Sequence, residues 1–355
     1  MFKPDLLTML DGTPVTSAAQ WRNRRAELIA ILEREEYGIQ PAFTGEVEGC
    51  IRQKDERCCA GHAVHERIDI AFDTPGGRFS FPMQFVYPAD RKPHPLLVFL
   101  NFRREIYDPY CPLEEIVDHG FALGYICYTD VTTDDADMAN GLAGCWPRTD
   151  PATDWGKLSM WGFAASRTLD YLLTRPEVDG RNCGVIGHSR LGKAALVCGM
   201  YDERFRFILA NDSGCGGDAL EQTKHPGAET FAHMDKHFPF WFCGNRSKYA
   251  ADQSGMPFDQ HFLLAAIAPR FAAVGSASKD IWADPHSQQL CCAAATPAWT
   301  LHGVPGFIGP TEPAQVGNAF RQGCISYHLR DGLHYLNRTD WLHYMAFVKA
   351  NLAED

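Results

Sequence analysis

Short, continuously apolar segments recur along this 355-residue chain and alternate with segments of helical periodicity. A continuous apolar run is typical of a strand buried on both faces, which is the environment of a strand in a parallel sheet covered by helices. The segments with strand character are 95–102, 125–130, 182–189, 205–212 and 270–280. Helices are expected between them at 114–124, 155–174 and 190–201. This alternation predicts an α/β fold, with a mainly parallel central sheet flanked by helices.

The N-terminal part of the chain has a different pattern. Residues 64–73 and 78–87 alternate between apolar and polar side chains, and a Pro-Gly-Gly turn separates them. Such a pair predicts an antiparallel hairpin, placed at the N-terminal edge of the sheet. Residues 16–37 favour a helix that packs on the body of the protein. We therefore expect a single domain over residues 1–355, with an N-terminal helical extension of about residues 1–40.

The charge balance excludes some functions. Lysine and arginine total 33 and aspartate and glutamate total 44, so the formal net charge is −11. A chain this acidic has no overall electrostatic footprint for nucleic acid or for an anionic membrane. No run of roughly 18 consecutive apolar residues is present, so no membrane span is expected. The first residues contain aspartates and no long apolar run, and they do not resemble a signal peptide.

Thirteen cysteines are present, an odd number. Without a secretion signal, we interpret them as reduced thiols and expect a cytoplasmic protein. The adjacent pairs Cys58–Cys59 and Cys291–Cys292 have poor geometry for an ordinary disulfide. Most of the cysteines are therefore expected to act as small buried side chains.

The segment 184–196 (GVIGHSRLGKAAL) is the most informative about chemistry. An apolar strand enters a tight turn at Ser189 and a helix follows, which is the context of a nucleophile elbow. The first N–H groups of such a helix point at the site and can stabilise an oxyanion. The segment therefore predicts an α/β-hydrolase in which Ser189 is the nucleophile.

The turn departs from the usual G-x-S-x-G pattern. Leu191 occupies the second glycine position, and Gly192 follows one residue later. A purely structural βα turn is one alternative. A phosphate-binding loop is another, because Gly187 and Lys193 have P-loop spacing, but Ala194 replaces the hydroxyl residue that would bind magnesium.

A serine nucleophile needs a base, and in α/β-hydrolases the histidine follows the last strand. His328 lies in a predicted strand and His343 in a predicted helix, whereas His334 lies in the loop between them. A loop at the end of a strand is where the base is expected, so we predict His334. Asp212 and Asp280 each end a predicted strand, and either could orient the histidine or cap a turn.

Several further segments lie outside this general pattern and are specific in their sequence. They are GHSRLGKAAL (187–196), DERF (202–205), NDSGCGG (211–217), FPFWF (238–242), MPFDQHFLLAAIAPR (256–270), SASKDIWADP (276–285) and GLHY…DW (332–341). On these motifs the chain resembles the glucuronoyl esterase family, carbohydrate esterase family fifteen, and in particular its bacterial branch. The resemblance covers about residues 80–350 and implies an α/β-hydrolase fold.

The resemblance implies catalytic roles for individual residues. Ser189 corresponds to the nucleophile and His334 to the base. Asp212 corresponds to the acid that follows the nucleophile strand, although some members place an acid where Asp280 stands. Arg190 corresponds to the arginine that helps to form the oxyanion hole.

The resemblance also implies a uronic acid site, formed by Lys193, Trp282 and Glu229. One departure concerns His188, which precedes the serine where secreted fungal members have a cysteine. This departure argues against an extracellular, lignin-facing role. Substrates inside the cell would be small imported uronate esters.

The function implied is that of a serine carboxylic ester hydrolase. It would cleave alkyl or aryl esters of glucuronic or 4-O-methylglucuronic acid, derived from plant cell-wall xylan, through an acyl-enzyme and without a metal or organic cofactor. The substrate would be a small molecule or an oligosaccharide, with no nucleic-acid or membrane partner. The alternative enzyme is an acetyl xylan esterase that deacetylates xylo-oligosaccharides. The leaving alcohol and the oligomeric state stay open.

Two other classes of function compete. A non-catalytic carbohydrate-binding protein on a hydrolase scaffold is disfavoured by the intact set of serine, histidine and aspartate. A metalloenzyme would use His233 and His237, which share a helical face if the segment is helical, with His225 nearby. No glutamate completes an H-E-x-x-H pattern, so we interpret these histidines as rim or surface residues.

Overall fold

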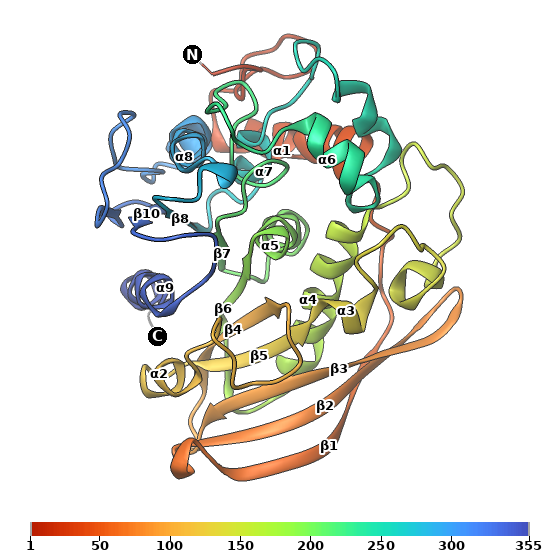
Figure 1. Ribbon diagram of the computed structural model, residues 1–355, viewed down its shortest axis with the longest axis vertical. Coiled ribbons are helices and arrows are strands. Elements are labelled where there is room, and N and C mark those ends of the chain that lie inside the picture. The colour runs from red at the N-terminus through yellow and green to blue at the C-terminus, as the bar shows by residue number, and fades with distance from the viewer. Residues whose placement is uncertain (1, 354–355) are drawn as a thin grey trace.

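One ten-stranded sheet runs through residues 2–353, the part of the chain that the computed structural model describes (Figure 1). Its order is β1-β2-β3-β5-β4-β6-β7-β8-β10-β9. The strands are β1 (Val47–Cys58), β2 (Ala63–Thr74), β3 (Gly77–Pro88), β4 (His94–Asn101), β5 (Ala122–Cys127), β6 (Val178–His188), β7 (Phe207–Asn211), β8 (Phe271–Ala277), β9 (Ala319–Phe320) and β10 (Ile325–Arg330). The parallel part of the sheet consists of the neighbouring strands β5, β4, β6, β7, β8 and β10. Strands β1, β2 and β3 form an antiparallel meander that pairs antiparallel with β5, and β9 pairs antiparallel with β10.

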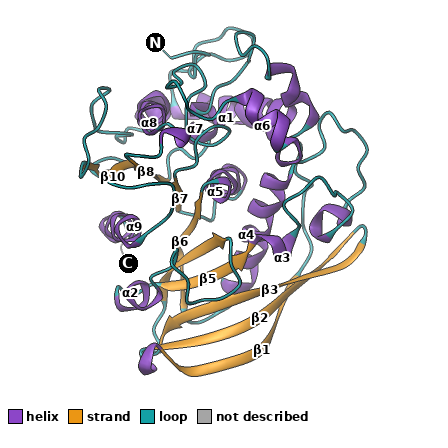
Figure 2. Ribbon diagram, in the orientation of Figure 1, coloured by secondary structure: helices purple, strands orange, loops and turns teal. Residues whose placement is uncertain are grey.

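Helices cover both faces of this sheet (Figure 2). They are α1 (Ala18–Leu32), α2 (Leu113–Asp118), α3 (Tyr128–Val131), α4 (Lys157–Leu172), α5 (Arg190–Tyr201), α6 (Phe231–His237), α7 (His261–Ala265), α8 (Pro285–Thr300) and α9 (Arg338–Ala350). Apolar side chains of α2 and α9 belong to one buried cluster, and those of α4, α5 and α8 belong to the other. None of these helices has the length and apolar character that a membrane crossing requires.

The predicted α/β architecture is confirmed, and so is the antiparallel hairpin, which is formed by β2 and β3. The helix expected at 114–124 is shorter than predicted, since α2 ends at Asp118 and β5 already begins at Ala122. Gly120 lies between them with a φ of +77°, a left-handed conformation that glycine adopts without strain and that ends the helix.

The N-terminal segment is attached to the body of the protein by polar contacts as well as by packing. Arg25 on α1 donates from Nε to the carbonyl of Ala266 at 2.7 Å, and from Nη2 to the carbonyl of Met200 at 2.7 Å. Residues 33–37, predicted to continue this helix, form a π-helical turn.

The parallel strands decide where the site lies. The carboxyl ends of β6, β7, β8 and β10 meet at one edge of the sheet, and the predicted catalytic residues lie in the segments that follow them. In open parallel sheets ligands bind at this edge.

Candidate active site

Ser189 lies at the apex of a strained turn between β6 and α5. Its φ is +58° and its ψ is −127°, and its N–H donates to the carbonyl of Asn211 at 2.8 Å. Gly187 permits the turn, because a Cβ at this position would lie 2.1 Å from the carbonyl oxygen of Leu191. A left-handed backbone costs a residue other than glycine roughly 1–2 kcal/mol, and such strain is concentrated at functional sites.

The structure explains why glycine follows Ser189 by three positions. Leu191 is fully buried and contributes to the core beneath α5. A Cβ at Gly192 would lie 3.0 Å from the Cβ of Ser213 and 3.2 Å from the carbonyl oxygen of Gly187. The close approach that needs glycine therefore occurs at position 192, and the shifted motif still forms an elbow.

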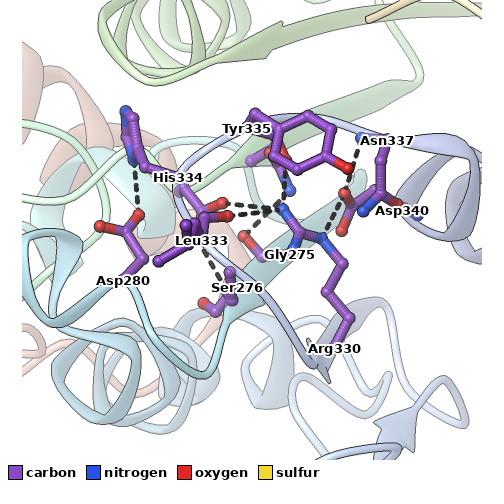
Figure 3. Close-up of polar contacts among 12 residues, drawn as sticks. Gly275, Ser276, Asp280, Arg330, Leu333, His334, Tyr335, Asn337 and Asp340 are labelled. Carbon is purple, nitrogen blue, oxygen red and sulfur yellow. Dashed lines mark hydrogen bonds and ion pairs between the residues drawn. The ribbon is translucent and has the colours of Figure 1, made fainter. Parts of the chain in front are cut away.

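His334 joins Ser189 to Asp280. Nε2 of His334 lies 2.8 Å from Oγ of Ser189, and Nδ1 lies 2.5 Å from Oδ2 of Asp280. Figure 3 shows the imidazole pointing toward the Asp280 carboxylate. A carboxylate oxygen accepts, so Nδ1 carries the proton and Nε2 is left to accept from the serine hydroxyl. This is the geometry of a serine nucleophile, a general base and an orienting acid.

Asp280 has two functions in this geometry. Its Oδ1 accepts from the N–H of Ala283 at 3.3 Å and so caps the short helical turn Ile281–Ala283, while Oδ2 holds His334. The cap fixes the carboxylate in the direction that the imidazole needs.

The preference for Asp212 as the acid is corrected by this geometry. Oδ1 of Asp212 accepts from the N–H of Ala277 at 2.9 Å, and Oδ2 lies 3.6 Å from Nη2 of Arg330, whereas the oxygen that Nδ1 of His334 contacts is Oδ2 of Asp280. Burial, together with the nearby Asp280 and Asp340, raises the pKa of Asp212 well above its usual value. A carboxyl that tends to be protonated is a weak partner for an imidazolium.

Arg190, the first residue of α5, is fixed beside the serine. Its Nη1 donates to Asp134, whose carboxylate also accepts from Nε1 of Trp241 at 2.7 Å and from the hydroxyl of Tyr128 at 3.1 Å. The guanidinium lies 4.7 Å from the centre of the Trp241 ring. Among the described residues, nothing accepts a hydrogen bond from the buried Nε of Arg190. This donor is available to a substrate oxygen.

A cavity of about 260 Å³ opens beside Ser189 and His334. The three residues predicted to bind the sugar, Lys193, Trp282 and Glu229, all line it. Nζ of Lys193 lies 3.5 Å from Oε2 of Glu229, and the N–H of Glu229 donates to the carbonyl of Trp282 at 2.9 Å. Segments distant in sequence are thus joined into one wall.

His188 lies beside the base. The two imidazole rings are 4.5 Å apart, and Nδ1 of His188 lies 2.7 Å from Oδ1 of Asn211. Burial lowers the pKa of His188 to about 3, and the neighbouring His334 contributes to the shift. A neutral His188 therefore adds no positive charge next to the imidazole that must accept the proton of Ser189.

The histidines considered as metal ligands, His233 and His237, lie on α6. Their rings lie 4.4 Å apart and are tilted by 34°, and His233 packs edge-on against Trp282 at 4.7 Å. Within residues 2–353, the one set of three ligand-type side chains whose ligand atoms converge is Asp212, Asp280 and His334. The side chain of His233 lines the cavity, as expected for a rim residue.

Sequence reasoning did not identify Asp134, Phe238 or Trp241 individually as site residues. Phe238 and Trp241 line the cavity and belong to FPFWF (238–242), one of the segments that carry the family resemblance. Asp134 carries no such signal, because it lies in an acidic stretch that reads as a solvated loop.

Comparisons with known proteins agree with this site. A family model for fungal glucuronyl esterases matches residues 68–303. A carbohydrate esterase named MZ0003, from an unknown prokaryotic organism, is 31% identical over 97% of this chain and 88% of its own length. The 4-O-methyl-glucuronoyl methylesterase of Schizophyllum commune is 25% identical over 85% of this chain and 74% of its own. The solved structure of a glucuronoyl esterase from Solibacter usitatus has a TM-score of 0.89 and 32% identity, covering 99% of this chain and 97% of its own.

Proposed function

The chain belongs to the glucuronoyl esterase family, and on this basis we propose that it hydrolyses esters between the carboxyl group of glucuronic or 4-O-methylglucuronic acid and an alcohol. The observation that carries the proposal is the linked set Ser189, His334 and Asp280 at the mouth of a cavity whose walls are polar and aromatic. The natural esters would derive from plant xylan.

The first half of the reaction forms an acyl-enzyme. Oγ of Ser189 attacks the ester carbonyl while Nε2 of His334 takes its proton, a form of assistance worth about 10²–10⁴ in rate. The oxyanion that develops is met by Nε of Arg190 and by the N-terminal N–H groups of α5. The loss of one such donor typically lowers kcat by on the order of 10²–10³. The first half ends when the imidazolium of His334, stabilised by Asp280, protonates the oxygen of the departing alcohol and leaves the acyl-enzyme.

The second half releases the acid. Water then enters, His334 takes one of its protons, and the resulting hydroxide attacks the acyl carbonyl. Collapse of this second tetrahedral intermediate returns the proton to Ser189 and frees the uronic acid.

The cavity wall suits a uronyl group. The paired Lys193 and Glu229 offer donors and acceptors to sugar hydroxyls, and Trp282, with 44% of its surface exposed, offers a ring face to the apolar side of a pyranose. An acetyl group carries no hydroxyl groups that could bond to these residues.

A paired substrate assay tests this choice of acyl group. We expect kcat/KM for methyl glucuronate to exceed that for acetylated xylose by about 100-fold or more, because a site built to hydrogen-bond a substrate group discriminates strongly against a substrate that lacks it. Lys193→Met should lower kcat/KM for the uronate ester by on the order of 10–100-fold, the value of a hydrogen bond to a charged group.

The control for this assay is Lys236→Met, which removes an exposed lysine from α6, an element of the same rim, and should leave both activities unchanged. Equal or greater activity on acetylated xylose would point to the deacetylase instead.

We also propose that the enzyme works in a reducing, cytoplasmic compartment, on small imported esters. Support comes from its thirteen cysteines, which are all free thiols and mostly buried. Acid quenching and alkylation of cells that make the protein naturally, followed by mass analysis, should find thirteen alkylated cysteines and no disulfide. A disulfide-linked species would contradict the proposed compartment.

A further inference from the structure

The two residues that flank His334 have little apolar anchoring, although Leu336 beyond them is fully buried. Leu333 is 64% exposed and Tyr335 is 41% exposed, and the side chain of His334 is itself 38% exposed. Segments with few buried apolar contacts open at low free energy. A displacement of about 1 Å in a catalytic group can cost on the order of 10² in rate. Polar contacts must therefore fix the backbone at His334 itself.

Arg330, the last residue of β10, supplies those contacts. Its side chain is almost completely buried beneath the loop (Figure 3). Nη1 donates to the carbonyl of Asp331 at 3.1 Å, and Nη2 donates to the carbonyl of Leu333 at 3.2 Å and to that of Tyr335. The guanidinium thus binds the backbone on both sides of His334.

The guanidinium is itself fixed from below. Nε of Arg330 donates to Oδ2 of Asp340 at 2.7 Å, and the other carboxylate oxygen of Asp340 lies 2.9 Å from Nε2 of His328. Asp340 also belongs to the capping box that begins α9, in which Oδ2 accepts from the N–H of Asn337 at 3.0 Å. Arg330 therefore connects the loop that carries His334 to the first turn of α9.

Gly332 completes the fit between the loop and the guanidinium. Its φ is +126°, and a Cβ at this position would lie 2.7 Å from Nη1 of Arg330. The chain thus closes around the guanidinium so tightly that a side chain at position 332 would displace it.

The same loop is tied to the segment that carries the acid. The N–H of Lys279 donates to the carbonyl of Gly332 at 2.9 Å, and Oγ of Ser278 donates to Oδ1 of Asp331 at 2.9 Å. A displacement of the His334 loop would therefore also displace, or break its hydrogen bonds with, the segment just before Asp280.

We infer that Arg330 is the positioning residue for the catalytic base: its guanidinium fixes the backbone on both sides of His334 and so keeps the imidazole between Asp280 and Ser189. Arginine suits this task because its planar fork presents five donors, whereas lysine offers one nitrogen. The inference rests on the proposed role of His334. Arg330 itself is not among the residues that line the cavity.

Two variants test the inference, Arg330→Gln and Arg330→Lys. Neither side chain can bind three carbonyls, so each should lower kcat for methyl glucuronate about 100-fold while KM stays within about twofold. A fluorophosphonate probe, which needs the base but no sugar, should label Ser189 more slowly by the same factor. Arg330→Lys keeps the charge beside Asp340 and carries the test if the glutamine variant does not fold.

The matched control is Arg175→Gln. It breaks the ion pair between Arg175 and Glu66 on β2, which lies near the other end of the strand order from β10. It should lower Tm without changing kcat or the labelling rate. Wild-type labelling in either folded Arg330 variant would overturn the inference, and full activity of Arg330→Lys would show that charge alone is needed. If the wild-type protein reacts with the probe but hydrolyses no uronate ester, the proposed substrate is wrong, while the labelling rates still decide the role of Arg330.

Discussion

Ser189→Ala is expected to lower kcat for methyl glucuronate by on the order of 10⁴–10⁶-fold, the scale seen when the nucleophile of a serine hydrolase is removed. KM should change little, because Lys193, Glu229 and Trp282 remain in the cavity wall. The fold should persist, since alanine meets the same backbone strain as serine at this position. Steady-state kinetics and thermal unfolding check these expectations together.

The control for this change is Ser159→Ala. Ser159 is buried on α4 and donates to the carbonyl of Tyr37 at 3.1 Å, far along the chain from the elbow. It should retain full activity and full labelling by a fluorophosphonate. Substantial hydrolysis by Ser189→Ala would exclude an acyl-enzyme on this serine.

Asp280→Asn is expected to lower kcat about 10⁴-fold, the effect of the equivalent change in a serine protease triad. An asparagine amide can donate to Nδ1, which would move the proton of His334 to Nε2 and prevent it from accepting from Ser189. The cap on Ala283 can still form through the amide oxygen, so the loop should keep its shape.

The paired variant, Asp212→Asn, separates the two acids. Its Oδ1 contact with the N–H of Ala277 can be kept by the amide oxygen, and its other oxygen accepts no hydrogen bond from any described residue. We expect a loss of tenfold or less in kcat. A larger loss for Asp212→Asn than for Asp280→Asn would reverse the assignment of the acid.

The sequence predicts the parallel part of the sheet well because each buried strand must be continuously apolar, a local property. It did not predict β1, whose residues are mostly polar because the strand lies at an open edge, with one neighbour and much of its length in solvent. Charged side chains on such an edge oppose pairing with other molecules. They also remove the apolar pattern by which a buried strand is recognised in a sequence.

Ser189 and His334 could be identified from the chain alone, since the elbow needs small residues at fixed positions and the base must follow the last parallel strand. The choice between Asp212 and Asp280 could not be made from the chain alone, because each of them follows a strand that ends at the same edge of the sheet. It was decided by hydrogen bonding: Asp280 contacts Nδ1 of His334, whereas Oδ1 of Asp212 accepts from Ala277, 65 positions away in sequence.

The supporting residues depend on tertiary structure for the same reason. Asp134 holds Arg190 across 56 positions, and Arg330 is linked to Asp212 as well as to its own loop. A turn or a strand is specified by neighbouring residues, and so the sequence determined the fold class, the nucleophile and the base. The partners of a buried charge are specified by which strands lie side by side, and so only the folded chain decided which acid and which guanidinium hold His334.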